Sequence, residues 1–179
     1  MIGCYRYQKL VFLLPLLLVH KGYSQGFTDR HKDVFERVEQ INAVQDNDTI
    51  ALEYQEELWQ ITEGGGVLVG SYKEGNLVKM VLRSYLSSGI NTFSYYFSDG
   101  ELFFVNEVFD QFHHNEKTNW YDPSNTERNF NGNYIFQNEK LIDLETLGHN
   151  RFEDDALDPE TELLNEAIQL KELLESKMK

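Results

Sequence analysis

The chain has few of the residues that several kinds of protein chemistry require. Its 179 residues include three prolines and one cysteine, Cys4. A single thiol excludes an intramolecular disulfide and a zinc site built from several cysteines. Basic residues are also scarce, because 16 Lys and Arg stand against 30 Asp and Glu, a formal net charge of −14. We therefore expect no nucleic-acid partner, since binding to a phosphate backbone needs clustered basic side chains.

Only one long hydrophobic run occurs, and it lies near the N-terminus. Residues 10–19 are apolar, follow two basic residues, and precede small residues that end at Ser24. This order is typical of a secretory signal, and the run is shorter than the roughly 20 residues that a membrane-spanning helix needs. We expect residues 1–24 to be a cleaved signal. The remainder would be released into the periplasm or beyond, with no membrane insertion.

Cleavage would remove Cys4 and three basic residues, but no acid. It leaves 155 residues with 13 basic and 30 acidic side chains, a net charge of −17. A secreted chain of this length without disulfides must be stabilised by an ordinary hydrophobic core. The 41% of hydrophobic residues is typical of such a core. The sequence therefore predicts a single domain over residues 25–179.

Amphipathic patterns predict a helix near each end of this domain. Residues 28–44 repeat apolar side chains at steps of three and four. A second helix over 159–177 has Asp158 as its N-cap and Pro159 in its first position. Its apolar stripe consists of Leu163, Leu164, Ala167, Ile168, Leu170 and Leu174. Residues 49–62 fit a strand or a helix, and a strand followed by a loop is the preferred interpretation.

Residues 66–145 follow a period of two, which indicates strands. They form three pairs, so we expect an α+β domain with a six-stranded, mostly antiparallel β-meander flanked by the two helices. The middle pair surrounds Asp99-Gly100, which suits a type I′ turn with positive φ at both central residues. That turn predicts two facing pairs on one core face, Phe97 with Leu102 and Tyr95 with Phe104.

The three pairs of strands share one spacing of an aromatic residue, a turn and a leucine. The repeats are Tyr72-x-x-Gly75-x-Leu77, Phe97-x-x-Gly100-x-Leu102 and Phe136-x-x-Glu139-x-Leu141. Hairpins that recur in this way stack side by side, each burying its face against the next. A glutamate with positive φ costs about 1–2 kcal/mol. We therefore expect a longer or different turn around Glu139.

The middle repeat resembles a known kind of protein. Its Tyr-Tyr-Phe-x-x-Gly-x-Leu-Phe-Phe-Val pattern over residues 95–105 is similar to that of small exported bacterial proteins of unassigned function, and the end of the predicted signal resembles those of Bacteroidota. A looser similarity is to MORN-type repeats. The resemblance implies repeated β-hairpins and export, and it implies no activity.

Histidines provide the candidates for metal chemistry. His113, His114 and Glu116 lie close together in the segment 110–132, which we expect to be a loop, and His149 follows later. Imidazole and carboxylate groups together suit zinc or nickel, so a metal-dependent hydrolase centred on them is one alternative. No further motif fixes a third ligand, and a solvated polar loop is the simpler interpretation. We expect no cofactor.

Aromatic residues are the leading candidates for binding. Tyr96 and Phe103 fall on the face of the sheet opposite the predicted core, and Trp120 and Tyr121 lie in the expected loop. If exposed, they suit a protein or glycan partner, whereas helices over that face would bury the first two. The expected function is a non-catalytic binding or accessory module. The alternatives are the metal-dependent hydrolase and an acidic inhibitor of a basic enzyme.

Overall fold

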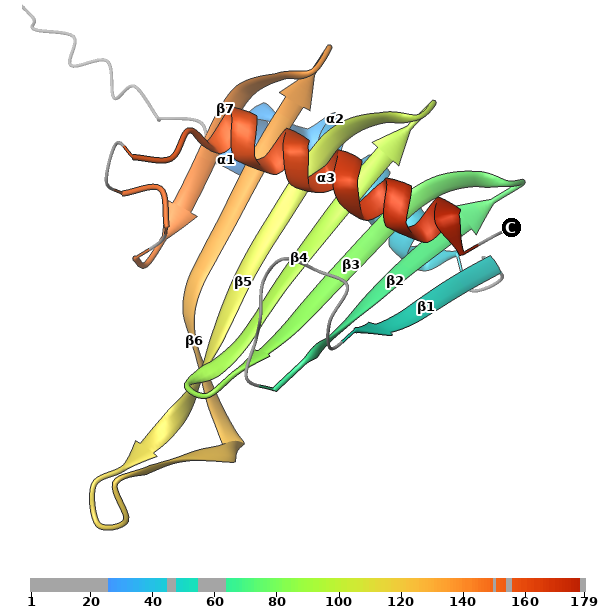
Figure 1. The fold of residues 1–179 in the computed structure, drawn as a ribbon. Coiled ribbons are helices and arrows are strands. Elements are labelled where there is room, and N and C mark those ends of the chain that lie inside the picture. Colours follow the sequence, from blue (N-terminus) through green and yellow to red (C-terminus); the bar gives the residue numbers. More distant parts are fainter. Residues whose placement is uncertain (1–25, 45–47, 55–63, 150, 154–155, 178–179) are drawn as a thin grey trace, which may run out of the picture.

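A computed structural model describes residues 26–44, 48–54, 64–149, 151–153 and 156–177. They form a seven-stranded sheet with helices at both ends of the chain (Figure 1). Every pairing is antiparallel, and the strand order in the sheet follows the chain from β1 to β7. The predicted α+β class is therefore confirmed. The predicted signal, residues 1–24, lies outside the described residues.

The described elements begin with two short helices and end with a long one. The helices are α1 Phe27–Arg30, α2 Lys32–Ala43 and α3 Pro159–Ser176. The strands are β1 Asp48–Tyr54, β2 Gly66–Lys73, β3 Asn76–Leu86, β4 Gly89–Ser98, β5 Glu101–Asn115, β6 Trp120–Gln137 and β7 Lys140–Leu147. The first helix was expected to be continuous, but it breaks at His31, where φ is −120°.

The sheet has one strand more than the sequence predicted. The additional strand is β1, which pairs with β2 over its whole length. It confirms a strand for the first part of residues 49–62, whose second part lies outside the described residues. The expected count included only the three repeated pairs, although a strand was the preferred interpretation for the first part of residues 49–62.

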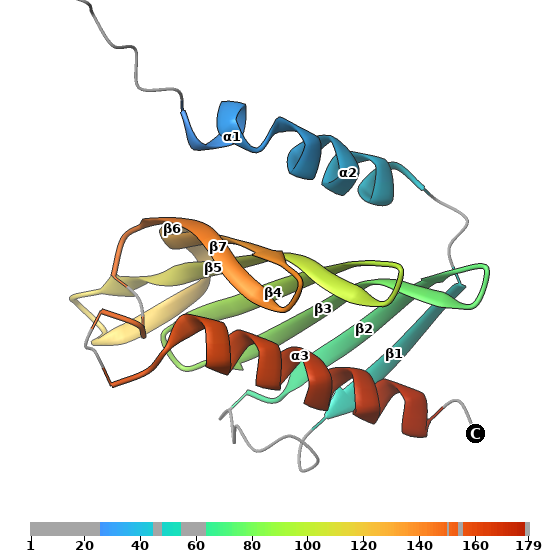
Figure 2. The same ribbon diagram turned by 90° about the horizontal axis from the view of Figure 1, so that it is seen from above.

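The helices cover opposite faces of the sheet, as the view in Figure 2 shows. α1 and α2 lie over one face, and α3 crosses the other. α3 starts as predicted, because the Asp158 carboxylate accepts hydrogen bonds from the Thr161 backbone N (2.9 Å) and Oγ1 (2.6 Å). Two covered faces explain why adjacent residues of the central strands are both apolar.

The larger core lies between α3 and the sheet. Its buried members include Leu68, Met80, Phe93, Tyr95, Phe97, Val105, Tyr134, Phe136, Leu163, Ala167, Leu170 and Leu174. The predicted stripe on α3 is correct except at one position, since Ile168 is 55% exposed. Glu166 is buried on the same helix instead. Its burial depends on an arginine from another segment, described below.

The smaller core lies beneath α1 and α2. It combines Phe27 and Val38 of the helices with Tyr96, Phe103, Phe104 and Ile135 of the sheet. Phe35 of α2 packs edge-on against Phe104, with ring centroids 5.5 Å apart. The aromatic residues on this face are therefore packing residues.

The hairpins β2–β3, β4–β5 and β6–β7, which carry the three repeats, end in the same kind of two-residue turn. Positive φ occurs at both central residues: Glu74 (52°) and Gly75 (80°), Asp99 (53°) and Gly100 (86°), Asn138 (50°) and Glu139 (59°). The backbone predicted for Asp99-Gly100 is confirmed. The expectation of a different turn at Glu139 is wrong, because Gln137 pairs directly with Lys140. Packing of the flanking Phe136 and Leu141 against the α3 core offsets the cost of the glutamate conformation.

The repeated spacing also encodes a β-bulge. After each aromatic–leucine pair the register shifts, leaving one extra residue in the second strand: Val78, Phe103 or Ile142. Phe97 faces Leu102 as predicted, but the bulge sets Tyr96 rather than Tyr95 opposite Phe104. The predicted pair of Tyr95 with Phe104 is therefore wrong, and Tyr95 faces Val105.

Candidate functional site

The segment 110–132 was expected to be a loop, and the structure shows paired strands there instead. β4 pairs with β5 only as far as Gln111, and β7 pairs with β6 only from Asn131 onward. Between these limits β5 and β6 pair with each other alone. We call residues 112–130 the hairpin arm, which projects beyond the sheet in Figure 1. The prediction failed because the polar composition of the segment conceals its cross-strand pairing.

Polar pairs hold the base of the hairpin arm. The Arg128 Nε lies 3.1 Å from the Asp110 Oδ1, directly across the ladder. Beside them, the Asn129 Nδ2 donates to the Gln111 Oε1 at 2.6 Å. Both pairs are exposed, so each adds little stability and the backbone ladder carries the arm.

The outer half of the hairpin arm is shaped by two local hydrogen-bonded turns. The Asp122 Oδ1 accepts from the backbone N (3.0 Å) and Oγ (2.6 Å) of Ser124, where β6 has three unpaired residues. These bonds lower the pKa of the Asp122 carboxyl. At the tip, the Asn115 Oδ1 accepts from the Lys117 backbone N at 3.0 Å. Both side chains act as local turn formers.

Two aromatic side chains stand on opposite faces of the hairpin arm. Trp120 and Tyr121 are consecutive residues in a regular part of β6, facing Asn115 and His114 across the ladder. Trp120 is 76% exposed. The Tyr121 ring packs edge-on against the imidazole of His114, with ring centroids 5.2 Å apart. The predicted aromatic pair therefore exposes one large ring on each face of the ribbon.

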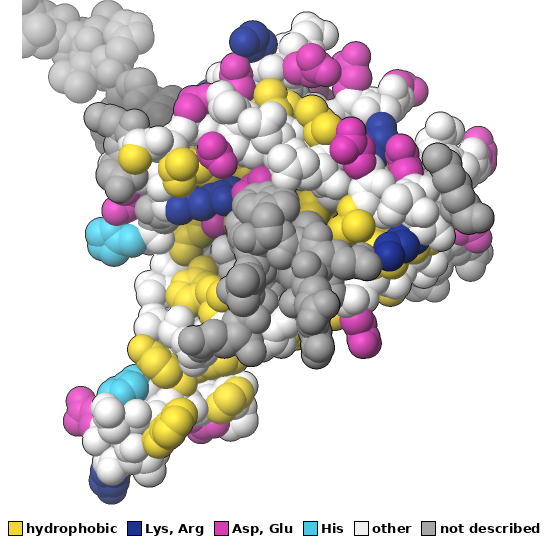
Figure 3. Space-filling view, viewed as in Figure 1, with side chains coloured by type: hydrophobic (Ala, Val, Ile, Leu, Met, Phe, Trp, Pro, Cys, Tyr) yellow, Lys and Arg dark blue, Asp and Glu magenta, His cyan; other side chains and the backbone are white. Residues whose placement is uncertain are grey.

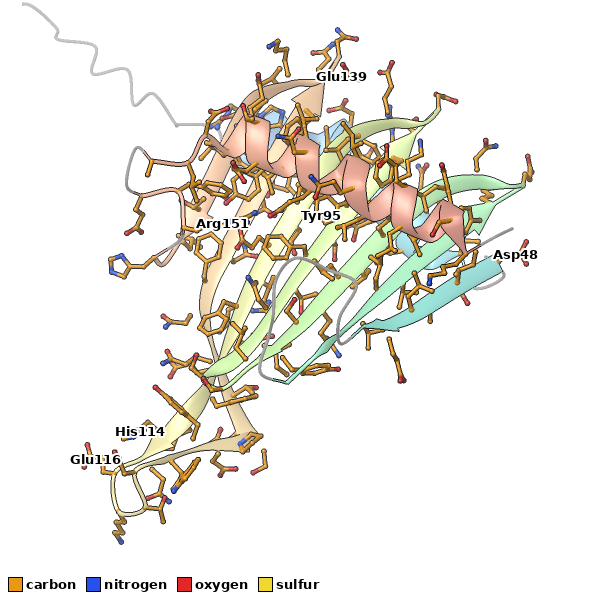
Figure 4. All side chains as sticks on the ribbon, in the orientation of Figure 1. Asp48, Tyr95, His114, Glu116, Glu139 and Arg151 are labelled. Atoms are coloured by element: carbon orange, nitrogen blue, oxygen red, sulfur yellow. The ribbon has the colours of Figure 1, made fainter. Side chains whose placement is uncertain are left out.

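The candidate metal ligands do not converge. His113 faces Asp122 across the ladder, His114 contacts Tyr121, and Glu116 lies in the tip turn (Figure 4). His149 instead hydrogen-bonds Glu153 through its Nδ1 at 2.9 Å, which raises the imidazole pKa. Among the described residues, no group of three or more His, Cys, Asp and Glu is placed to hold a metal.

Two of the predicted binding residues are buried beneath α2. Tyr96 is 5% exposed and Phe103 is 8% exposed. The guanidinium of Arg37 lies over the Phe103 ring, 5.1 Å from its centroid, and the ammonium of Lys79 lies at the same distance over Tyr96. These cation–π contacts close the face around the smaller core. Of the two alternatives for this face, the structure supports the one in which helices bury Tyr96 and Phe103, so these two predicted binding residues form no exposed surface.

A buried ionic cluster was missed by the sequence analysis. Both terminal nitrogens of Arg151 donate to the Glu166 carboxylate, at 2.6 and 2.8 Å, and the Tyr95 hydroxyl donates to the same carboxylate at 3.0 Å. The Tyr134 hydroxyl reaches the Glu107 Oε2 at 3.4 Å. We call these five residues the ionic cluster; Figure 4 labels Arg151 and Tyr95 beneath α3. No sequence motif predicts the ionic cluster, because its five residues come from β4, β5, β6, α3 and the segment 151–153.

The ionic cluster contains two carboxylates and one guanidinium. Glu107 and Glu166 are 4% and 5% exposed. Burial is the largest cause of the raised pKa of Glu107, and Arg151 partly opposes it. Burial likewise raises the pKa of both tyrosines. The cluster joins α3 to the sheet, and loss of its arginine would leave two carboxylates buried without a counter-charge.

The outer edge of β7 is a poor site for a partner strand. The backbone N of Leu141 donates to the Glu160 Oε2 at 2.8 Å, and the backbone N of Leu144 donates to the Asp143 Oδ1 at 3.0 Å. Side-chain carboxylates thus occupy donors that an added strand would need. Protection of this kind is common on edge strands.

The chain gives no match when compared with protein-family models, with curated proteins and with solved structures. In the part of the chain that the structure describes, every helix is too short or too polar to cross a membrane. Its projection from the sheet and the 76% exposure of Trp120 make the hairpin arm the best-defined candidate site.

Proposed function

We propose that the chain is an exported, non-catalytic binding module that contacts a protein partner through the hairpin arm. The observation that carries the proposal is the 76% exposure of Trp120 near the end of a projecting two-stranded ribbon. Exposed tryptophan is rare on surfaces that stay in water and common at the centres of protein interfaces.

The shape of the arm supports a partner with a cleft. Trp120 and Tyr121 point to opposite faces of the ribbon, so a flat partner surface would contact only one of them. A cleft whose two walls receive the two rings would bury both. The arm is already held as a paired ribbon in the free chain. Its backbone therefore loses little conformational entropy when a partner binds.

The charge of the arm distinguishes this proposal from an acidic inhibitor. Residues 112–130 contain three acids and two bases, whereas the whole chain has a net charge of −14. Binding through a nearly neutral aromatic arm depends weakly on salt, because apolar contacts are not screened. Binding through the acidic surface to a basic enzyme would instead weaken steeply with salt.

The test is capture of a partner by residues 25–179 from the envelope fraction of the native cell, at about 0.1 and 0.5 M salt. We expect one partner to be retained at both salt concentrations. The variant Trp120→Ala should reduce its capture at least tenfold. The matched control is Ile142→Ala, an exposed apolar residue on β7, which should capture as much as the unaltered chain.

Two outcomes would contradict the proposal. Equal capture by Trp120→Ala and the unaltered chain would show that the arm makes no contact. Loss of the partner at high salt with no effect of Trp120→Ala would favour the acidic inhibitor.

A further inference from the structure

A groove lies at the opposite end of the strands from the hairpin arm. It has a volume of about 470 Å³ and runs between α3 and the ends of the hairpins β4–β5 and β6–β7. Phe97 and Leu102 line its sheet side, and Leu164, Ala167 and Ile168 line its α3 side. Its size is within the range of pockets that bind small ligands or short peptide segments.

One large apolar side chain of the groove, that of Ile168, is exposed to solvent. The residues of α3 that face the sheet are buried, but Ile168 is 55% exposed and lies one turn beyond Leu164. α3 is thus apolar on a second side, along the groove. Figure 3 shows hydrophobic side chains at the surface in the region of α3, with carboxylates around them.

Some charged side chains of the groove form ion pairs within the described part of the chain, and others do not. Lys140 and Glu160 pair with each other at 3.0 Å. The carboxylates of Glu101 and Glu139, which come from two neighbouring hairpin ends, form no ion pair with any residue that the structure describes. Figure 4 shows Glu139 at its hairpin end, close to α3. The groove therefore combines an apolar floor with an acidic rim on the side of the hairpin ends, while Lys171 lines the α3 side.

We propose that this groove binds a short peptide segment that carries a large apolar side chain next to a lysine or arginine. The apolar side chain would cover Ile168 and Phe97, removing them from water. The adjacent cation would lie between Glu101 and Glu139, where charge-assisted hydrogen bonds to carboxylates are available. An anionic ligand is disfavoured there by both carboxylates. The groove is separate from the hairpin arm, so the chain would have two binding sites at its two ends.

The test uses ¹⁵N-labelled residues 25–179 and blocked dipeptides as probes. Acetyl-Leu-Arg-amide should give saturable shifts of the backbone signals of Gly100, Glu101 and Lys171, with a dissociation constant in the millimolar range. Acetyl-Leu-Glu-amide and acetyl-Ala-Arg-amide should each bind at least fivefold more weakly. The first comparison tests the acidic rim, and the second tests the apolar floor.

Variants make the assignment specific. Ile168→Lys should weaken binding of acetyl-Leu-Arg-amide at least tenfold, and the double variant Glu101→Gln with Glu139→Gln should remove the preference for arginine over glutamate. The control Ile142→Lys adds the same charge outside the groove and should leave binding unchanged. The spectrum of each variant reports directly whether it is folded.

Three results would overturn the proposal: no saturable shift with acetyl-Leu-Arg-amide, equal binding of the glutamate probe, or unchanged binding by a folded Ile168→Lys variant. Trp120→Ala is expected to bind the dipeptide normally. The groove and the arm can therefore fail independently.

Discussion

The body of the sheet and the hairpin arm each contain an arginine paired with a carboxylate, and the two pairs differ in what they do. In the body, Glu166 is buried and Arg151 is partly buried where α3 meets the sheet, and the Arg151 guanidinium lies over the rings of Phe93 and Phe152. At the base of the arm, Arg128 pairs with Asp110 of the adjoining sheet, and this pair is exposed. The same chemical pair is therefore a strong constraint on tertiary structure in one place and a weak one in the other.

The aromatic residues of the two regions differ in the same way. Tyr96 and Phe103 are covered by α2, whereas none of the three described helices lies over Trp120 and Tyr121. Covered rings stabilise the fold, and exposed rings are available to a partner. The comparison teaches that residue type alone does not distinguish packing from binding in this chain. The cover supplied by distant elements does.

The largest expected effect is on the ion pair of the body. Arg151→Met should lower the free energy of unfolding by about 3 kcal/mol, because it leaves the Glu166 and Glu107 carboxylates buried without a counter-charge. Arg128→Met is the matched variant in the arm and should cost less than about 1 kcal/mol. Urea unfolding of both variants measures the difference. Equal losses would show that the two pairs are not distinguished by burial.

The next largest effect is expected at Gly132, where neighbouring aromatic rings leave no space for a side chain. A Cβ at Gly132 would lie 2.8 Å from the Tyr134 ring and 2.9 Å from the Phe130 ring. Gly132→Ala should therefore displace Tyr134 from Glu107 and cost about 2 kcal/mol. Gly26→Ala is the control, since its Cβ would meet nothing closer than the Asp29 Oδ2 at 4.0 Å, an ordinary contact. Thermal unfolding of the two variants should separate them, and similar midpoints would contradict the packing described.

A smaller effect, opposite in sign, is expected at the third hairpin end. Glu139 has a φ of 59°, which glycine adopts without strain. Glu139→Gly should raise the free energy of unfolding by about 0.5–1 kcal/mol, after the greater backbone entropy of glycine is deducted. The neighbouring Lys140→Gly replaces an extended residue and should destabilise the chain. Denaturant unfolding of both variants measures the two changes in stability. A loss of stability in Glu139→Gly would mean that the glutamate side chain makes a stabilising contact.

Burial of Glu107 should appear in the pH dependence of stability. Burial raises the pKa of the Glu107 carboxyl above its usual value of 4.5, so above pH 4.5 the folded chain retains a proton that the unfolded chain loses. The contribution of this group is therefore most favourable below pH 4.5, and it declines as the pH rises through the folded pKa. Glu107→Gln should remove this decline, making the variant at least as stable as the unaltered chain at neutral pH.

The matched control for that experiment is Glu127→Gln, at an exposed position in the arm. It should keep the pH dependence of the unaltered chain when unfolding is followed from about pH 4 to 8. If Glu107→Gln and Glu127→Gln gave the same pH profile, the ionic cluster would not be the source of the decline.

The smallest effect is expected at the end of the arm. Trp120→Ala should change the free energy of unfolding by no more than about 0.5 kcal/mol, because the side chain packs against little. Phe103→Ala, in the covered face, should cost about 3 kcal/mol. Calorimetry of the two variants compares the regions directly. A large loss in Trp120→Ala would mean that this ring has a structural role.

Much of the architecture was predictable because it depends on the spacing of residues that are close in the sequence. The amphipathic stripes of the end helices, the Asp158 cap and the Asp99-Gly100 turn depend on residues a few positions apart. Where the prediction failed, a local preference was outweighed. Glu139 adopts positive φ because the strands on either side of it pair and pack, and the arm is a ribbon although its residues are polar.

Side chains that are close along the chain suffice to predict the end helices and the three hairpins that share the aromatic–leucine spacing. Which aromatic rings are covered and which charges are buried depends instead on how distant elements pack together. Tyr95 meets Glu166 across 71 positions of the sequence, and Tyr96 meets Asn42 across 54. Such contacts depend on where whole elements pack, and periodicity within one element carries no information about that packing.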